Sequence, residues 1–132
     1  VSSRGLGDVY KRQILLIGFG GFTGAISRYL VGVFINDIGL SSNISTILVN
    51  VIGSFFMGLL FYFFSINSSD FYKMFFVVGF LGSFTTFSAF SLDAMNLFFA
   101  SEYFNFFIYI TLSVILSIAF IFLGFILAKF IY

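Results

Sequence analysis

Four long apolar stretches dominate this sequence, and they restrict the folds open to it more than any other feature. They cover about residues 14–35, 44–64, 71–99 and 103–131, and short polar segments separate them. Crossing about 30 Å of hydrocarbon takes roughly 20 helical residues. Within lipid, only α-helices or closed β-barrels satisfy every backbone polar group, and barrel strands alternate apolar and polar residues. These stretches are continuously apolar, so the sequence predicts an all-α membrane protein with four transmembrane helices.

Composition argues against a soluble globular domain and against most enzymes. Only 8% of the 132 residues are charged, against roughly 25% in an ordinary soluble domain. The sequence has no cysteine and no histidine, so thiolate nucleophiles, the commonest general base and the commonest zinc ligands are missing. Its five acidic residues are thinly spread, and we therefore expect no enzyme. A formal net charge of +1 gives no reason to expect nucleic acid as a partner.

Residues 1–13 differ from the rest of the chain because they are charged and contain no apolar run. The charged residues among them are Arg4, Asp8, Lys11 and Arg12. The apolar stretch that follows is too long for a secretory signal and lacks a small-residue cleavage site. We expect residues 1–13 to be a non-native or flexible segment, with a short native cytoplasmic tail as the alternative, and the four-helix domain to occupy residues 14–132.

The basic residues indicate only a weak preference of orientation. With four spans, the N-terminus, the segment near Asp70 and the C-terminus share one side, which carries Lys73 and Lys129. The loops on the other side hold no Lys or Arg, although Arg28 lies toward that end of the first span. The positive-inside rule favours a cytoplasmic N-terminus. A bias this weak allows the chain to insert in both orientations.

Small residues in the first two spans predict close contacts between helices. Residues 20–24 read Gly-Gly-Phe-Thr-Gly, and Ser54 and Gly58 form a second pair of small residues four positions apart. Such pairs let helix backbones approach each other in lipid. The contacts could form within one chain or between two copies, and the sequence leaves both alternatives open.

Arg28 and Asn50 carry strongly polar side chains within the first two spans, where polar groups are expensive and therefore informative. Arg28 has small neighbours, which favours a side that faces protein, although its long stem could also reach the nearer membrane interface. Asn50 carries both N–H donors and an acceptor. It could bridge two helices or line a pore.

The third apolar stretch is interrupted at residues 79–91, which read GFLGSFTTFSAFS. Its glycines and the adjacent threonines Thr85 and Thr86 weaken a helix at its midpoint, so we expect a break there. Hydroxyl groups can satisfy the backbone groups that such a break frees. Freed carbonyls can also coordinate a cation, as they do in the unwound helices of transporters.

Phe87 and Phe90 lie among these hydroxyl groups, whereas we expect most of the 24 phenylalanines to face lipid. A phenyl ring has a positive edge, so rings presented edge-on attract an anion. In the last span, Ser113 and Ser117 are four residues apart and share a face. Their hydroxyls could extend a polar track or bond to carbonyls of their own helix.

Three motifs in this order resemble the Fluc (CrcB) family of fluoride channels. They are residues 20–29 (GGFTGAISRY), residues 46–55 (TILVNVIGSF) and residues 82–91 (GSFTTFSAFS), and the resemblance extends over residues 14–132. It implies a dual-topology, antiparallel homodimer with two fluoride pores in the inner (cytoplasmic) membrane of a prokaryote. Such a channel exports fluoride passively and lowers its cytoplasmic concentration.

The resemblance also implies roles for individual residues along the fluoride path. Asn50 would donate to the ion, and two phenyl rings would flank it, with hydroxyl groups on either side. The residues of the path would be Asn50, Phe87, Phe90, Ser88, Ser113 and Ser117.

A cofactor is implied as well, namely a structural sodium ion that is not transported. The backbone carbonyls of Gly82 and Thr85 from both subunits would hold it at the centre of the dimer. Arg28 would support the structure or the entrance for the anion.

Three residues depart from the pattern of the family. Ala89 replaces a hydroxyl residue that is often found there, Ser83 stands where glycine is common, and Asp93 stands where a glutamate usually follows. The ring and sodium positions are intact, so we expect activity to be retained.

Two other functions compete with this interpretation. A small multidrug exporter also has four short helices and forms dual-topology dimers, but it needs a membrane-embedded carboxylate in the first span. That span offers Arg28 and no acid. A non-conducting assembly subunit would need no polar break in the third span.

Overall fold

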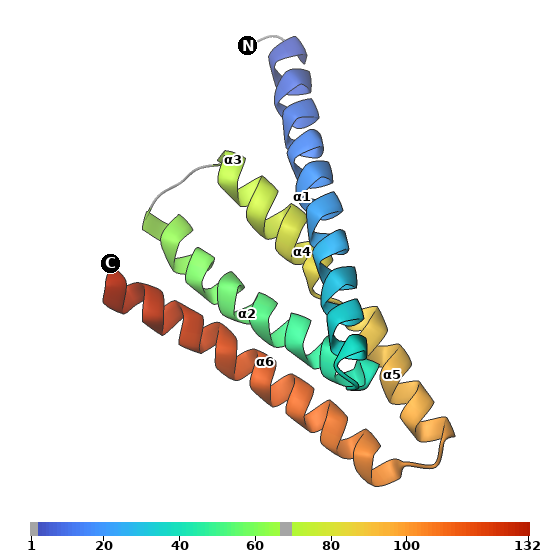
Figure 1. The fold of residues 1–132 in the computed structure, drawn as a ribbon. Helices are drawn as coiled ribbons and strands as arrows, with labels where there is room; N and C mark the ends of the chain where they lie inside the picture. Colours follow the sequence, from blue (N-terminus) through green and yellow to red (C-terminus); the bar gives the residue numbers. More distant parts are fainter. Residues whose placement is uncertain (1–2, 67–69) are drawn as a thin grey trace.

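The computed structural model describes residues 3–66 and 70–132, and it places all four apolar stretches in helices (Figure 1). The first, second and fourth spans are single helices: α1 (Ser3–Asp37), α2 (Ser42–Ile66) and α6 (Tyr103–Ile131). The third span is divided into α3 (Asp70–Tyr72), the π-helical segment η1 (Lys73–Leu81), α4 (Gly82–Phe84) and α5 (Phe87–Phe99). Each span is long and apolar enough to cross a membrane. The predicted all-α protein with four transmembrane helices and a break in the third is confirmed.

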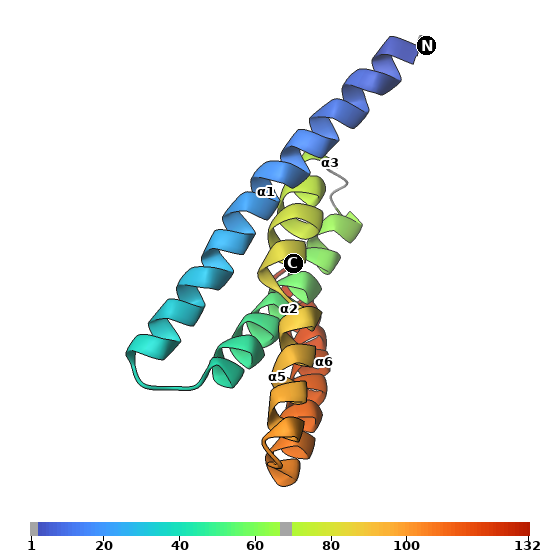
Figure 2. The ribbon, with the colours of Figure 1, turned by 90° about the vertical axis from the view of Figure 1, so that its right-hand side faces the viewer.

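The first helix begins earlier than the sequence predicted. We expected it to start at residue 14, whereas α1 begins at Ser3. Residues 3–13 contain no proline, so nothing interrupts the helix that the apolar span starts. In Figure 2 this first part of α1 projects beyond the other helices. The division of the chain at residue 13 stays a prediction.

Successive spans run antiparallel, and they pack in two pairs (Figures 1 and 2). α1 packs along η1 and α4, and α2 packs along α6. Glycines make both contacts close, because a β-carbon on Gly20 or Gly24 would overlap the backbone of η1, and one on Gly58 would overlap the backbone of α6. The glycines of the small-residue pairs, Gly20, Gly24 and Gly58, therefore serve packing within the chain, one of the two alternatives left open above.

The π-helical segment η1 was not expected from the sequence. Its hydrogen bonds join an N–H to the carbonyl five positions earlier, as in the bond from the Gly82 N–H to the Val77 carbonyl. In an α-helix of 3.6 residues per turn, residues five apart lie on different faces, whereas the wider π turn brings them together. The backbones of Phe75 and Phe80 consequently both lie against Gly20 of α1. We attribute η1 to this contact.

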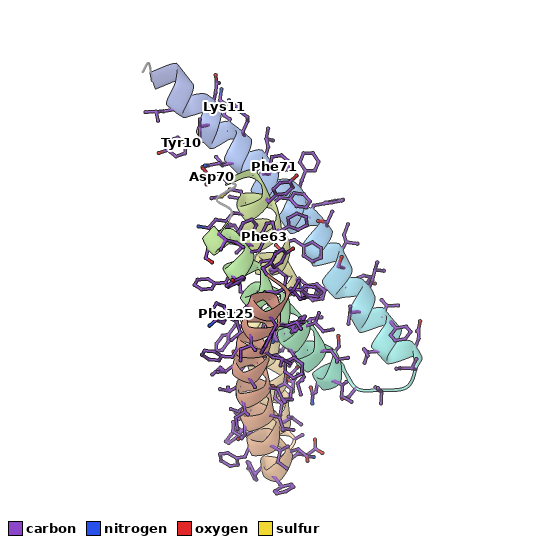
Figure 3. All side chains as sticks on the ribbon, turned by 90° about the vertical axis from the view of Figure 1, so that its left-hand side faces the viewer. Tyr10, Lys11, Phe63, Asp70, Phe71 and Phe125 are labelled. Atoms are coloured by element: carbon purple, nitrogen blue, oxygen red, sulfur yellow. The ribbon has the colours of Figure 1, made fainter. Side chains whose placement is uncertain are left out.

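Most side chains of the single chain face outward. Figure 3 shows them around the whole bundle, with Phe63 and Phe125 among those labelled. Large apolar residues on every span are exposed. Among the described residues, the buried large side chains are few: Ile35, Val49, Val51, Leu81, Phe84 and Tyr109. In a membrane this surface contacts lipid or another subunit rather than water. The chain is a multi-pass membrane protein.

Candidate functional site

The break in the third span lies at Thr85 and Thr86, where the sequence predicted it. Both residues have extended backbones, with φ −83° and ψ 154° at Thr85 and φ −151° and ψ 121° at Thr86. β-Branched residues tolerate this conformation well. Thr86 then caps α5, because its hydroxyl accepts from the Ala89 N–H at 3.2 Å.

Asn50 of α2 clamps the break through both ends of its amide. Its Nδ2 donates to the Thr86 carbonyl at 3.0 Å, and its Oδ1 accepts from the Thr86 N–H at 2.7 Å. Asn50 therefore bridges two helices, one of the alternatives that the sequence left open. An amide nitrogen carries two N–H donors, so one donor remains outside this pair.

The break takes the helical partners from several backbone carbonyls, those of Gly82 and Thr85 among them. The Thr86 N–H donates to Asn50, whereas an uninterrupted helix would direct it to the carbonyl of Gly82. Likewise the Ala89 N–H donates to the Thr86 hydroxyl rather than to the carbonyl of Thr85. Gly82 itself is exposed on the single chain. The carbonyls of Gly82 and Thr85, which the family resemblance assigned to sodium, are thus among those that the break releases.

Arg28 contacts the break from the opposite side. Its Nε donates to the Ser83 carbonyl at 3.1 Å. Gly20, Gly24 and Arg28 are four residues apart and lie along one face of α1, so the close glycine contact brings the guanidinium to the break. Arg28 therefore faces protein, which is one of the two alternatives that the sequence left open for it.

A groove of about 390 Å³ opens beside the break, between α2, α5 and α6. Five of the six residues predicted for the fluoride path line it, and Thr85 and Thr86 form part of its wall. Those five are Asn50, Phe87, Phe90, Ser113 and Ser117. The rest of the wall consists of Gly53, Ser54 and the apolar side chains of Met57, Val114, Ile118 and Ile121. Within residues 3–66 and 70–132, no charged side chain lines this groove.

The two phenyl rings lie together at the groove but in different surroundings. The centroids of Phe87 and Phe90 are 5.4 Å apart, with 40° between the ring planes. Phe90 is half-buried, and its ring stacks on Tyr109 at 5.4 Å. Phe87 is 78% exposed in the single chain. One ring is therefore fixed by its own chain, while the other is left open on this side.

The predicted hydroxyl residues divide into three situations. Ser113 is buried, and its Oγ has no hydrogen-bond partner among the described residues. It does not bond back to its own helix, which was one of the two alternatives for it. Ser117 lines the same groove. Ser88 lies elsewhere, because its hydroxyl is exposed and pairs with that of Thr86 at 3.2 Å.

A buried carboxylate beside the site was not identified from the sequence as functional. Asp93 of α5 is 8% exposed, and its Oδ2 accepts from the Thr46 hydroxyl at 2.7 Å and from the Tyr109 hydroxyl at 2.9 Å. The three residues join α2, α5 and α6, and one of them, Tyr109, stacks on the Phe90 ring. An acid within an apolar stretch is a signal that could have found this network, but it was noted only as a departure from a family pattern.

A second cleft, of about 550 Å³, lies between α1, α2 and α5. Arg28 and Asp93 both line it, together with amide side chains of Asn36 and Asn96. Thr86 lines this cleft and the groove alike. Thr86, which is hydrogen-bonded to Asn50, therefore lies between a charged cleft and an uncharged groove.

Comparisons with known proteins agree with this geometry. A family model described as "CrcB-like protein, Camphor Resistance (CrcB)" matches residues 15–125. The "Fluoride-specific ion channel FluC" of Campylobacter lari is 46% identical over 121 residues, or 88% of this chain and 97% of that protein. The protein of the same name from Campylobacter fetus is 43% identical over 122 residues, covering 90% and 95%. The one from Nitratiruptor sp. is 41% identical over 117 residues, covering 88% and 91%.

The matched region contains the whole candidate site. It begins within the apolar part of α1 and ends within α6, so it includes the break, the Asn50 clamp and the groove. Both the family model and the relatives extend over most of the chain. The family resemblance of the three sequence motifs is confirmed, and the chain belongs to the CrcB family.

Proposed function

We propose that the protein is a fluoride-selective channel that lets fluoride leave the cytoplasm passively along the groove. One observation carries this proposal, namely the Ser113 hydroxyl, which is buried in the groove wall without a partner among the described residues. A hydroxyl in this state is free to donate to an ion or a water in the groove. Relatives with 41% to 46% identity are named as fluoride-specific ion channels, and they are channels rather than enzymes.

The groove offers the groups that can replace water around a small anion. The remaining N–H of Asn50 and the hydroxyls of Ser113 and Ser117 are donors, and the edges of phenyl rings are weakly positive. A ring of fixed charges would hold fluoride too tightly to release it, since conduction needs several weak sites. The uncharged wall of this groove meets that requirement.

The charged cleft supplies an entrance in this proposal. Arg28 and Asp93 both line it. The Asp93 carboxyl is engaged by the Thr46 and Tyr109 hydroxyls, and the positive charge of Arg28 would draw anions to the mouth of the path. Thr86, which lines both spaces, marks the passage from the entrance to the groove. Efflux needs no energy source. Hydrofluoric acid ionises in the cytoplasm, and the fluoride trapped there flows out down its own gradient.

A homodimer belongs to the proposal because one chain leaves the groove open. Phe87 is 78% exposed, and a ring that flanks a permeating ion must be enclosed by protein. The weak bias of basic residues allows both orientations, which fits an antiparallel, dual-topology pair of subunits in the cytoplasmic membrane. Each subunit then contributes one groove, giving two paths per dimer.

The freed carbonyls support a structural sodium ion at the centre of this dimer. Oxygen ligands suit a hard cation, and Gly82 and Thr85 provide two carbonyls whose helical partners are engaged elsewhere. One chain supplies too few ligands to enclose an ion, whereas two chains related by symmetry double the set. When bound, sodium would compensate the partial negative charges of these carbonyls.

The test is fluoride efflux from liposomes that contain the purified protein, followed with a fluoride electrode. We expect fast fluoride release, negligible chloride release from matched liposomes, and loss of fluoride release in Phe87→Ile. That substitution keeps an apolar side chain but removes the positive ring edge. Absence of fluoride release from verified dimeric protein would contradict the channel and favour a non-conducting assembly subunit.

A further inference from the structure

Gly53 lies at a place where any side chain would disturb the break. It is buried in α2, three residues after Asn50 and therefore on the same face. A β-carbon on Gly53 would overlap the methyl group of Thr85. The helix α2 thus touches the break at two successive points, through the Asn50 amide on Thr86 and through the bare backbone of Gly53 under Thr85.

The Thr85 methyl group cannot leave this position freely. The Thr85 hydroxyl donates to the Leu81 carbonyl at 2.9 Å. Because the threonine β-carbon is chiral, a hydroxyl held in one staggered position also fixes the methyl group. The methyl could move from Gly53 only if the hydroxyl left Leu81 or the Thr85 backbone shifted.

We propose that Gly53 is a positioning residue for the permeation path. The space over its backbone seats the Thr85 methyl group, and this seat fixes the direction of the Thr85 carbonyl and of the extended backbone that leads to Phe87. The inference rests on the proposed function, since it concerns the carbonyl assigned to sodium and the ring assigned to fluoride. It assigns to Gly53 a task that its packing in α2 alone would not require.

Two substitutions at this contact form a sharp test in the liposome efflux assay. Gly53→Ala places a methyl group against that of Thr85, and we expect fluoride efflux to fall about tenfold. Thr85→Ser keeps the hydroxyl for Leu81 and removes the methyl, so it makes room for the new side chain. In the Thr85→Ser background, we expect Gly53→Ala to lower efflux by no more than about twofold.

Two glycines of the same chain provide matched controls. A β-carbon on Gly18 meets nothing within 4 Å, so Gly18→Ala should leave fluoride efflux unchanged. A β-carbon on Gly58 would overlap the backbone of Ile121 in α6. Gly58→Ala should therefore destabilise the protein, and Thr85→Ser should not relieve that effect, because the two sites share no contact.

Thermal unfolding in sodium and in N-methyl-D-glucamine buffers gives a readout that does not depend on flux. We expect the sodium-dependent increment in Tm to be present in wild type, lost in Gly53→Ala and restored by adding Thr85→Ser. A packing role alone would lower Tm equally in both buffers, as expected for Gly58→Ala.

The outcomes separate this inference from the proposed function. The wild type could conduct fluoride while Gly53→Ala shows the same efflux and the same sodium-dependent increment in Tm. That result would overturn the role of Gly53 and leave the channel proposal intact. Absence of rescue by Thr85→Ser would overturn it as well. Absence of fluoride conduction in the wild type would instead overturn the channel proposal. In that case, a sodium-dependent increment in Tm that Gly53→Ala retains would still contradict the role of Gly53.

Discussion

Asn50 and Ser113 face the same groove with different hydrogen-bonding states. The Asn50 amide is held on both sides by the Thr86 backbone, so its remaining donor has a fixed direction. Ser113 has no partner among the described residues and can turn its hydroxyl toward whatever occupies the groove. Asn50 thus offers the groove an N–H of fixed direction, and Ser113 offers a hydroxyl that can rotate.

Replacing Ser113 by alanine should separate function from stability. A buried hydroxyl without a partner costs about 1–3 kcal/mol, so Ser113→Ala should leave the free energy of unfolding unchanged or raise it by up to about 1 kcal/mol. Fluoride efflux should nevertheless fall about fivefold, because one donor on the path is lost. The measurements are thermal unfolding of the purified protein and electrode-recorded efflux.

Thr111→Val serves as the control, since Thr111 is exposed and lies only two residues from Ser113. We expect it to change neither quantity. A fall in stability of Ser113→Ala without a change in efflux would mean that the hydroxyl is structural.

At this scale the sequence predicted much of the site, and its failures have physical causes. Polar residues in apolar spans stood out, which is why Asn50, Arg28 and Ser113 could be identified. Ser88 shares the same signal but points its hydroxyl to Thr86, and composition alone cannot distinguish the faces of a broken helix. Asp93 and Tyr109 were missed because their partnership joins residues 16 positions apart on two helices.

At the scale of elements, the break could be predicted and the π segment could not. Thr85 and Thr86 weaken an α-helix through their own conformational preferences, so the signal is local. The segment η1 contains no glycine or proline before Gly79, and its winding reflects contact with the glycine face of α1. Tertiary contact of this kind leaves no periodic pattern in the segment that it changes.

The contact of α1 with the break gives a prediction at this scale. Arg28→Leu removes the Nε donor and leaves the Ser83 carbonyl without it, and losing a hydrogen bond to a charged group costs about 1.5–3 kcal/mol. We expect a lower Tm together with reduced fluoride efflux, because the break loses its support from α1. Thermal unfolding and efflux measured on the same preparation would check this.

The exposed Lys73, at the start of η1, offers a charge-matched control. Lys73→Leu also removes one positive charge, and we expect it to leave Tm nearly unchanged. If both substitutions lowered Tm equally, net charge rather than the Ser83 contact would explain the effect of Arg28→Leu.

At the scale of the whole molecule, the single chain leaves its candidate site uncovered. Its groove is open, Phe87 is largely exposed, and Gly82 carries a freed carbonyl on an exposed part of the surface. All three features lie at or near the break in the third span. A second subunit placed over this region would close the groove and bring a second set of carbonyls to the first.

Sodium removal tests this arrangement as a whole. If carbonyls from two subunits share one ion, replacing sodium by the larger N-methyl-D-glucamine should lower the dimer fraction and the fluoride efflux together, since a ligand that binds only the assembled state stabilises it. Light scattering during size-exclusion chromatography would report the dimer, and efflux from the same protein would report conduction. Potassium, which is larger than sodium, should restore less of both than sodium does. An unchanged dimer fraction and unchanged efflux in sodium-free buffer would show that the freed carbonyls are satisfied without a cation, and the dimer would then depend on apolar contacts alone.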